Sequence, residues 1–229
     1  MKILAIIPAR GGSKGIPKKN IIDVLGKPLI AYTIEPALAA LQQGFIQELI
    51  VSTDSEEIAE VAKSLGANVP FIRPADLAAD QSKSIDLIQH AIQYYAAQNR
   101  TFDAVLLLQP TSPLRTTLDI QKAIELFKHQ AADSLISGYK EEYINDLVLY
   151  HLASDGVTTI PLNKQHNQGV RRQDHGHVYV RNGCIYLSKV ALIQKGLIIG
   201  EQPLMYVMDK KQSINIDNMD DLELIKAYL

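Results

Sequence analysis

The chain has 229 residues, of which 47% are hydrophobic and 21% charged, with a formal net charge of −2. This length suits one large α/β domain, and the charge balance gives no basis for general nucleic-acid binding. The single cysteine excludes an internal disulfide and a Cys-rich metal site, and no apolar stretch approaches the roughly 20 residues of a membrane span. We therefore expect a cytoplasmic protein without nucleic-acid or membrane partners.

The first half of the chain alternates between short apolar runs and amphipathic stretches. Runs typical of buried strands lie at 2–8, 47–53, 69–72 and 103–109. Stretches with helical spacing lie at 28–43, 55–65, 84–98 and 117–129. We expect Asp54 to cap the second helix, with Glu57 as its capping-box partner. The alternation predicts parallel strands joined by crossover helices, which is an α/β fold with a doubly wound, mostly parallel, Rossmann-like sheet.

Polar loops follow several of these strands, at 9–20, 73–84 and 109–115. Ligands of open α/β sheets bind at the carboxyl ends of the strands. Because parallel strands end at the same edge, we expect these loops to meet there and to form the functional site.

The second half of the chain is less regular. Segment 139–180 is polar and has only short β-like pieces, so we interpret it as an excursion from the sheet within a single domain that covers 1–229. Strand patterns return at 182–188 and 204–208, and a final helix is expected over 219–228, capped by Asn218. Cys184 lies in the first of these strands, where we expect a buried packing residue rather than a reactive thiol.

The loop at 9–20 reads ARGGSKGIPKKN and is rich in glycine and cations. Its spacing fits neither the Walker A motif nor the dinucleotide fingerprint. Glycine nevertheless lets backbone amides approach a ligand closely, and arginine and lysine bind phosphate as a planar fork and as a point charge. Together, an amide nest and basic side chains would place phosphate among Arg10, Gly11, Gly12, Ser13, Lys14 and Lys19. The alternative is a solvated basic turn, which is less compatible with a loop that leaves a buried parallel strand.

Short motifs along nearly the whole chain resemble, in order, those of the CMP-sialic acid synthetases, the acylneuraminate cytidylyltransferases. They are IIPARGGSKGIPKKNI, GKPLIAYTI, VSTDSEEIAEVAKSLGA, FIRPADLAAD, LLQPTSPLR, RRQD, NG-x-IY and IDNMDDL. The resemblance implies a nucleotidyltransferase fold and a reaction in which CTP and a nine-carbon sugar acid give the CMP-sugar and diphosphate. In that reaction the anomeric hydroxyl of the sugar attacks the α-phosphorus of CTP.

The resemblance also implies which residues bind CTP. They are Arg10, Gly11, Gly12, Ser13, Lys14, Lys19, Asn20, Arg73 and Ser84. Arg10 and Lys19 would be catalytic, with Lys19 steadying the α-phosphoryl group and the departing diphosphate by charge. Arg73 and Ser84 would line the cytidine pocket; alternatively, Arg73 forms a surface ion pair with Asp76 or Asp80.

The sugar acid, by the same resemblance, would be held by Gln109, Lys140, Arg171, Arg172 and Gln173. A carboxylate substrate favours a bidentate arginine donor, although an exposed charged loop is an alternative for the RRQD stretch. Segment 139–180 would be a dimerisation arm that reaches the neighbouring subunit's site, which makes a homodimer the expected assembly. We expect Arg115 to have only a supporting role in the site. The alternative is that it pairs locally with Asp119.

The family's Asp-x-Asp pair, which binds Mg²⁺, departs from its usual form in INIDN. Asn215 stands at the first position and Asp217 at the second. Mg²⁺ prefers oxygen ligands, often one or two carboxylates with phosphate oxygens and water. We therefore expect Asp217 to be a catalytic metal ligand and Asn215 to offer its amide oxygen. His166, His175 and His177 lack the further ligands that a zinc site requires.

Two rival functions remain open at this point. One is a related nucleotidyltransferase that uses Kdo or a sugar phosphate, although a sugar phosphate would not need a carboxylate clamp. The other is a non-catalytic nucleotide-binding regulator, which only Asn215 favours. Neither the particular nine-carbon sugar nor a general base can be read from the sequence.

Overall fold

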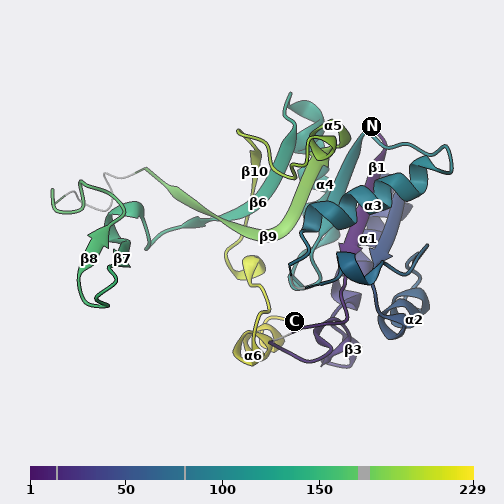
Figure 1. Ribbon diagram of the computed structural model, residues 1–229, viewed down its shortest axis with the longest axis horizontal. Coiled ribbons are helices and arrows are strands. Elements are labelled where there is room, and N and C mark those ends of the chain that lie inside the picture. The colour runs from purple at the N-terminus through teal and green to yellow at the C-terminus, as the bar shows by residue number, and fades with distance from the viewer. Residues whose placement is uncertain (14, 80, 170–175) are drawn as a thin grey trace.

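The computed structural model describes residues 1–13, 15–79, 81–169 and 176–229, and its centre is a six-stranded sheet in the order β10-β6-β9-β5-β1-β4 (Figure 1). The strands are β1 (Ile3–Pro8), β4 (Glu48–Ser52), β5 (Ala104–Leu108), β6 (Ser134–Glu141), β9 (Val178–Lys189) and β10 (Leu204–Met208). β9 runs antiparallel to both of its neighbours, and the other strands share one direction. The expected mostly parallel α/β sheet is therefore confirmed, with one reversed strand inserted in its middle.

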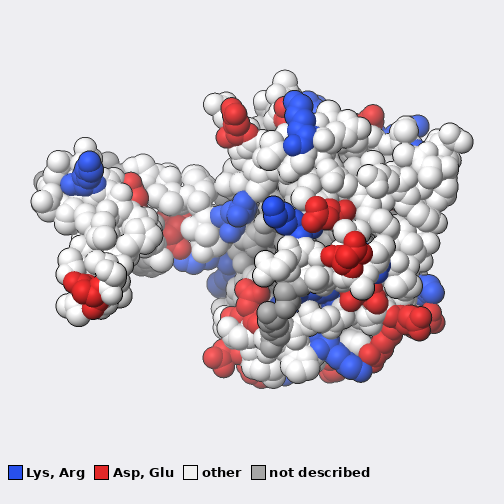
Figure 2. Space-filling model, in the orientation of Figure 1, with Lys and Arg blue, Asp and Glu red and all other residues white. Residues whose placement is uncertain are grey.

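An arm leaves the sheet where β6 and β9 continue past their neighbours as an antiparallel pair (Figure 1). At its end lies a hairpin of β7 (Tyr150–Leu152) and β8 (Thr159–Pro161), preceded by a 3-10 turn, Asp146–Val148. Segment 139–180, which we read as an excursion, contains these elements. In Figure 2 uncharged residues make up most of its visible face, with separate small groups of Lys or Arg and of Asp or Glu between them.

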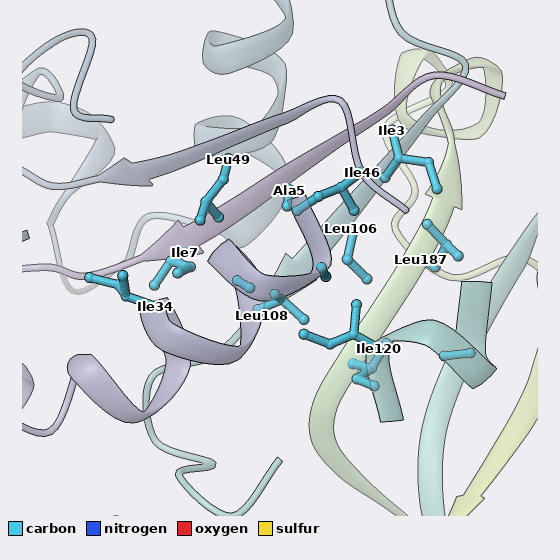
Figure 3. Packing of buried hydrophobic residues seen from close by; sticks show 14 of the residues in the cluster. Ile3, Ala5, Ile7, Ile34, Ile46, Leu49, Leu106, Leu108, Ile120 and Leu187 are labelled. Carbon is cyan, nitrogen blue, oxygen red and sulfur yellow. The ribbon is translucent and has the colours of Figure 1, made fainter. Parts of the chain in front are cut away.

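Both faces of the sheet are covered, which explains why its strands are almost continuously apolar. Along β1, Ile3, Ala5 and Ile7 pack on one side, and Leu4 and Ile6 on the other. Figure 3 shows the first side, where Ile34 and Ile120 approach the strands from two helices.

The helices are α1 (Ala31–Gln42), α2 (Glu56–Ser64), α3 (Ser84–Ala96), α4 (Thr117–His129), α5 (Val190–Gln194) and α6 (Met219–Lys226). The cores place α1, α2 and α4 on one face of the sheet and α3 and α5 on the other. Short 3-10 turns lie at Lys19–Ile21, Ala75–Leu77 and Lys211–Ser213, and a small hairpin pairs β2 (Asp23–Val24) with β3 (Lys27–Pro28). Within the described ranges, no helix has the length and apolar character needed to cross a bilayer.

Most predicted elements are confirmed, including the terminal helix, where the Asn218 side chain accepts the backbone N–H of Asp221. Two predictions are wrong. The strand expected at 69–72 is reduced to isolated bridges at Asn68 and Ile72. The cap of α2 is Ser55, whose hydroxyl accepts the N–H of Ile58, because the Asp54 side chain is engaged elsewhere.

Candidate active site

The loop after β1 is shaped by contacts with distant segments. The Asn20 side chain, which is buried, donates from Nδ2 to the Arg10 carbonyl at 2.9 Å. Gly15 lies so close to the segment before α6 that a Cβ atom there would be 2.4 Å from the Asp217 carbonyl oxygen. A side chain at position 15 would therefore push these two segments apart, so the glycine is required by close approach rather than by a turn.

A cavity of about 320 Å³ opens at the carboxyl edge of the sheet, between this loop, the 73–84 loop and the end of β5. Its polar lining is Arg10, Ser13, Lys19, Asn20, Arg73, Ser82, Lys83, Ser84, Gln109 and Thr111, and its apolar lining is Pro8, Leu77, Ala78, Ala79, Leu87 and Pro110. The expected meeting of the three loops is thus observed. The structure brings together Arg10, Ser13, Lys19, Asn20, Arg73, Ser84 and Gln109 from the predicted site.

The guanidinium-bearing residues Arg10 and Arg73 both line this cavity. Arg73 is only 4% exposed, and burial lowers the pKa of its guanidinium, with the Arg10 charge acting in the same direction and Asp54 opposing both. Two like charges lining one partly buried cavity create a local attraction for anions. The N-terminus of α3, at Ser84, borders the same cavity and adds the positive end of a helix dipole.

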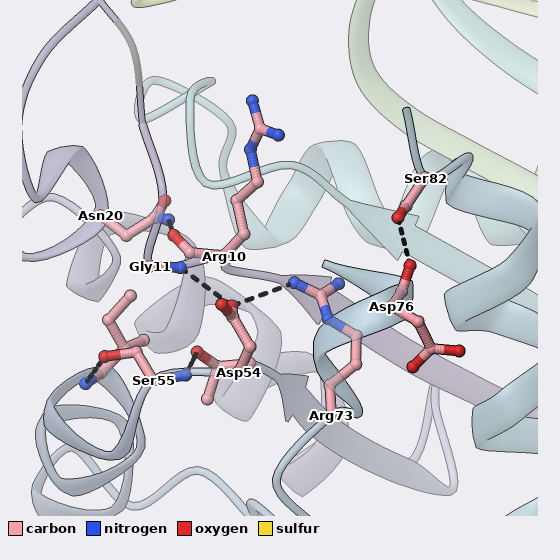
Figure 4. A network of polar contacts seen from close by, with 10 residues as sticks. Arg10, Gly11, Asn20, Asp54, Ser55, Arg73, Asp76 and Ser82 are labelled. Atoms are coloured by element: carbon pink, nitrogen blue, oxygen red, sulfur yellow. Dashed lines mark hydrogen bonds and ion pairs between the residues drawn. The ribbon is translucent and has the colours of Figure 1, made fainter. Parts of the chain in front are cut away.

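Asp54 joins the two loops on either side of this cavity (Figure 4). Its Oδ1 accepts the backbone N–H of Gly11 at 2.9 Å and lies 3.5 Å from Nη2 of Arg73. Arg73 therefore pairs with Asp54 and not with Asp76, and the other expected partner, Asp80, lies outside the described residues. The Gly11 amide, expected to be part of an anion nest, already has an anionic acceptor within the chain. In Figure 4 the Arg10 side chain extends away from this network.

Lys19 links the cavity to the segment before α6. Its Nζ donates to the Ile216 carbonyl at 2.9 Å and lies 3.7 Å from Oδ1 of Asp217. Asn215 donates from Nδ2 to Oδ2 of Asp217 at 2.8 Å, so the predicted metal pair does lie together, with the Asp217 side chain 72% exposed. In the described part of the chain, no group of three His, Cys, Asp or Glu side chains could hold a metal by itself.

Gln109 directly follows β5 and lines the cavity, and the buried Arg115 lies behind it. Arg115 donates to the Gln109 carbonyl, to the Cys184 carbonyl at 2.6 Å and to Oγ1 of Thr33 at 2.8 Å. The local pairing of Arg115 with Asp119 is wrong, because Asp119 accepts from Thr116 and from the Tyr206 hydroxyl. Cys184 is buried, as expected, and burial raises the pKa of its thiol.

Two other predicted residues that the structure describes, Gly12 and Lys140, do not line this cavity. Lys140 lies on β6 opposite Tyr179, where the arm begins. Gly12 has no atom near the position of a Cβ, so it faces open space. Lys14, Arg171, Arg172 and Gln173 lie outside the described residues, as does His175; His166 contacts the Tyr150 hydroxyl through Nδ1 at 3.0 Å.

Sequence reasoning missed Asp54, which it assigned to a helix cap, and the structural need for Gly15. Asp54 could have been found by its place, since it follows β4 at the edge where the polar loops meet. Gly15 carried no such signal, because its close neighbour is about two hundred residues away in the chain.

A sequence model of a family described as cytidylyltransferases matches residues 4–225. The chain belongs to this cytidylyltransferase family. The match covers the β1 loop, the cavity and the segment before α6, so the geometry described above lies within the family's shared region.

Curated relatives match over most of this cytidylyltransferase. A pseudaminic acid cytidylyltransferase of Campylobacter jejuni is 37% identical over 99% of this chain and 95% of its own length. An N-acylneuraminate cytidylyltransferase of Escherichia coli is 36% identical over 97% of this chain, which spans 51% of that relative. A CMP-N,N'-diacetyllegionaminic acid synthase of Legionella pneumophila is 49% identical over 56% of this chain and 54% of its own length.

Solved structures agree with the fold at low sequence identity. A CMP:2-keto-3-deoxy-manno-octonic acid synthetase complexed with CTP has a TM-score of 0.71 and 16% identity, with 100% of this chain and 98% of the other covered. A 4-diphosphocytidyl-2C-methyl-D-erythritol synthase from Anaerococcus prevotii has a TM-score of 0.67 and 15% identity, with 99% and 97% covered. At this identity the likeness supports the fold alone.

Proposed function

We propose that this cytidylyltransferase activates a nine-carbon sialic-acid-like sugar: CTP and a nonulosonate give CMP-nonulosonate and diphosphate. The observation that carries the proposal is the cavity at the carboxyl edge, where Arg10, Lys19 and Arg73 converge with Gln109. It is supported by relatives named for pseudaminic, legionaminic and N-acylneuraminic acids. The reaction joins the anomeric oxygen to the α-phosphorus and breaks that phosphorus's bond to the β-phosphate oxygen, so the hydroxyl proton is lost and diphosphate leaves.

The triphosphate would lie against Arg10, Ser13 and Lys19, with Gly12 and Lys14 from the same loop. Transfer of this kind depends mainly on positioning and on charge stabilisation of the transferred group. Lys19 suits the second role because its Nζ is held by the Ile216 carbonyl beside Asp217. Asn20 would act through the loop, since its amide is already hydrogen-bonded to the Arg10 carbonyl. The base would lie towards Arg73 and Ser84.

Asp217 and Asn215 would hold Mg²⁺. A single exposed carboxylate with an adjacent amide fits this ion, which commonly takes one or two carboxylates and completes its shell with phosphate oxygens and water. When bound, Mg²⁺ would neutralise charge on the phosphates and polarise the attacking hydroxyl. Lys19 would then share the anionic charge of the triphosphate with the metal site.

The arm would complete the sugar side of the site in a homodimer. Its apolar side chains are strongly exposed, with Leu152 at 65% and Val157 at 81%, and no part of the described chain covers them. Such a surface is typical of a protein interface. Lys140, Arg171, Arg172 and Gln173 would bind the acid sugar from this arm, while Gln109 binds it from the body.

The test is diphosphate release from CTP with a panel of acids: pseudaminic, legionaminic, N-acetylneuraminic and Kdo. We expect Mg²⁺-dependent turnover with at least one nine-carbon acid and much less with Kdo. A preference for Kdo would support the rival sugar nucleotidyltransferase, and CTP binding without turnover of any acid would support a non-catalytic regulator.

We further propose that the reaction is cytoplasmic, which is consistent with a single buried thiol. Its product would feed capsule or lipopolysaccharide glycan assembly.

A further inference from the structure

Arg115 is a buried cation that forms no ion pair with the described carboxylates, although the charge of Asp119 acts on it from a greater distance. Its residue exposure is 2%, and none of the carboxylates in the described ranges lies within ion-pair distance of its guanidinium. Burial lowers the pKa of Arg115 to about 10, so it remains charged at neutral pH. Burying a charged guanidinium costs folding free energy, and a packed apolar side chain of similar volume avoids this cost. Core packing alone therefore does not explain an arginine at this position.

The hydrogen bonds of Arg115 lie where two strands part. The β5–β9 ladder ends at the pair Leu108 and Ile185. The next residue of each strand, Gln109 and Cys184, presents its carbonyl to the Arg115 guanidinium, with Nη1 to oxygen distances of 3.3 and 2.6 Å. The guanidinium thus replaces ladder bonds at the point where the sheet opens towards the cavity.

A second contact fixes the guanidinium itself. Nη2 donates to Oγ1 of Thr33 on α1 at 2.8 Å, which sets the plane of the fork against a rigid helix. Lysine could supply the charge but not a planar set of donors spread over these acceptors. The Gln109 side chain, whose backbone is held in this way, lines the cavity.

We propose that Arg115 is a positioning residue that fixes the end of β5 so that the Gln109 amide faces the acid sugar. The inference rests on the proposed function, because it assigns the sugar to Gln109. Arg115 is not among the described residues that line the cavity, so its effect would pass through the backbone of Gln109.

The first experiment compares Arg115→Lys and Arg115→Met with Tyr206→Phe, using full-length protein. Tyr206→Phe is the matched control, since it removes a neighbouring part-buried hydrogen bond, to Asp119, without touching Arg115. Hydrogen–deuterium exchange should be faster in the 109–115 peptide of both Arg115 variants and unchanged there in the control. Unaltered exchange in Arg115→Lys would overturn the proposal whatever the enzyme's activity.

The second experiment separates positioning from general instability. In Arg115→Lys we expect kcat/KM for the sugar acid to fall about 10- to 100-fold, as small misplacements do, while the CTP dissociation constant changes less than about threefold. Gln109→Ala should cost much less in the Arg115→Lys background than in the wild type, because residues that act through one another are not additive.

Each outcome decides a different question. Additive effects of the two substitutions, or equal losses of CTP and sugar affinity, would contradict a positioning role. A wild-type enzyme that turns over no nonulosonate would contradict the proposed function, and the exchange experiment would still decide whether Arg115 fixes the end of β5.

Discussion

The body and the arm of this cytidylyltransferase bury their apolar residues to very different extents. In the body, strands such as β1 and β5 are enclosed on both faces, and Ile3, Ile7 and Leu106 have no exposed surface. In the arm, Tyr143 is 70% exposed and Val157 81%. The body therefore encloses its apolar side chains within the described chain, whereas the arm leaves its own exposed; under the proposed function the body would hold the nucleotide and the arm would need a second subunit. We therefore expect the affinity for CTP to depend on the body and the affinity for the sugar acid to depend on the arm.

The largest effect is expected on the nucleotide side, from Lys19→Met. The substitution removes the charge held beside Asp217 by the Ile216 carbonyl. We expect kcat to fall by about 10²–10³-fold, as for other groups that stabilise developing charge. The control is Lys18→Met, which removes an exposed pair with Glu57. A similar loss in both variants would show that overall charge, and not the position of Lys19, matters.

Next in size is the effect of Leu152→Asp on the arm. A charge on this 65% exposed apolar side chain should disfavour an apolar interface and shift the protein towards monomer in sedimentation experiments. The KM for the sugar acid should rise about tenfold or more if lost interface contacts carry sugar affinity, while CTP affinity stays near that of the wild type. A monomer that retains full sugar affinity would separate the arm from catalysis.

A smaller effect is expected from Asp54→Asn. Asparagine can still accept the Gly11 amide, but it no longer neutralises the buried Arg73. The CTP dissociation constant should change by about three- to tenfold, the range of one charge-assisted hydrogen bond, with no change in the KM for the sugar. Calorimetry measures this, and Glu57→Gln, on the exposed side of α2, is the control. Unchanged CTP affinity would make the Asp54 bridge a purely structural contact.

The smallest effect is expected on the unfolding temperature, from Glu141 at the end of β6, where the arm leaves the sheet. This effect depends on pH. The Lys210 hydrogen bond and the Tyr143 and Glu142 amides lower the pKa of Glu141 from 4.5 to about 2. Because the folded pKa is depressed, its contribution to stability is present above about pH 4.5 and is lost as the pH falls towards about 2. The unfolding temperature of Glu141→Gln should therefore lie below that of the wild type at pH 7 and approach it in acid. A pH-independent difference, or the same behaviour in Glu142→Gln, would contradict this.

Much of the fold could be predicted because its signals are local. The apolar run at 103–109 and the helical spacing at 117–129 correspond to β5 and α4, since burial on both faces and an amphipathic stripe each leave a clear period. The reversed direction of β9 could not be predicted, because a buried strand has the same pattern whichever way it runs. The segment expected to form a strand at 69–72 makes only one isolated bridge, between Ile72 and Thr53.

In the candidate site, too, some residues could be predicted from the sequence and others could not. Motif resemblance located Arg10, Lys19, Arg73 and Gln109, which line one cavity. Local rules failed for Asp54 and Arg115. Asp54 precedes a helix, where a cap is a sound expectation, but Arg73 and the Gly11 amide bind it instead. Arg115 lies four residues from Asp119, yet it donates to the nearby Gln109 carbonyl and to Thr33 and Cys184, which are far away in the chain.

The central claim is that the cations and amides at the end of β1 bind a nucleoside triphosphate. Calorimetric titration of CTP with Mg²⁺ into the wild type and into Arg10→Glu tests it most directly. We expect clear binding by the wild type and a dissociation constant at least about tenfold weaker in the variant, which places a negative charge in the cavity. Equal affinity in the two proteins, or no heat with the wild type, would contradict the account.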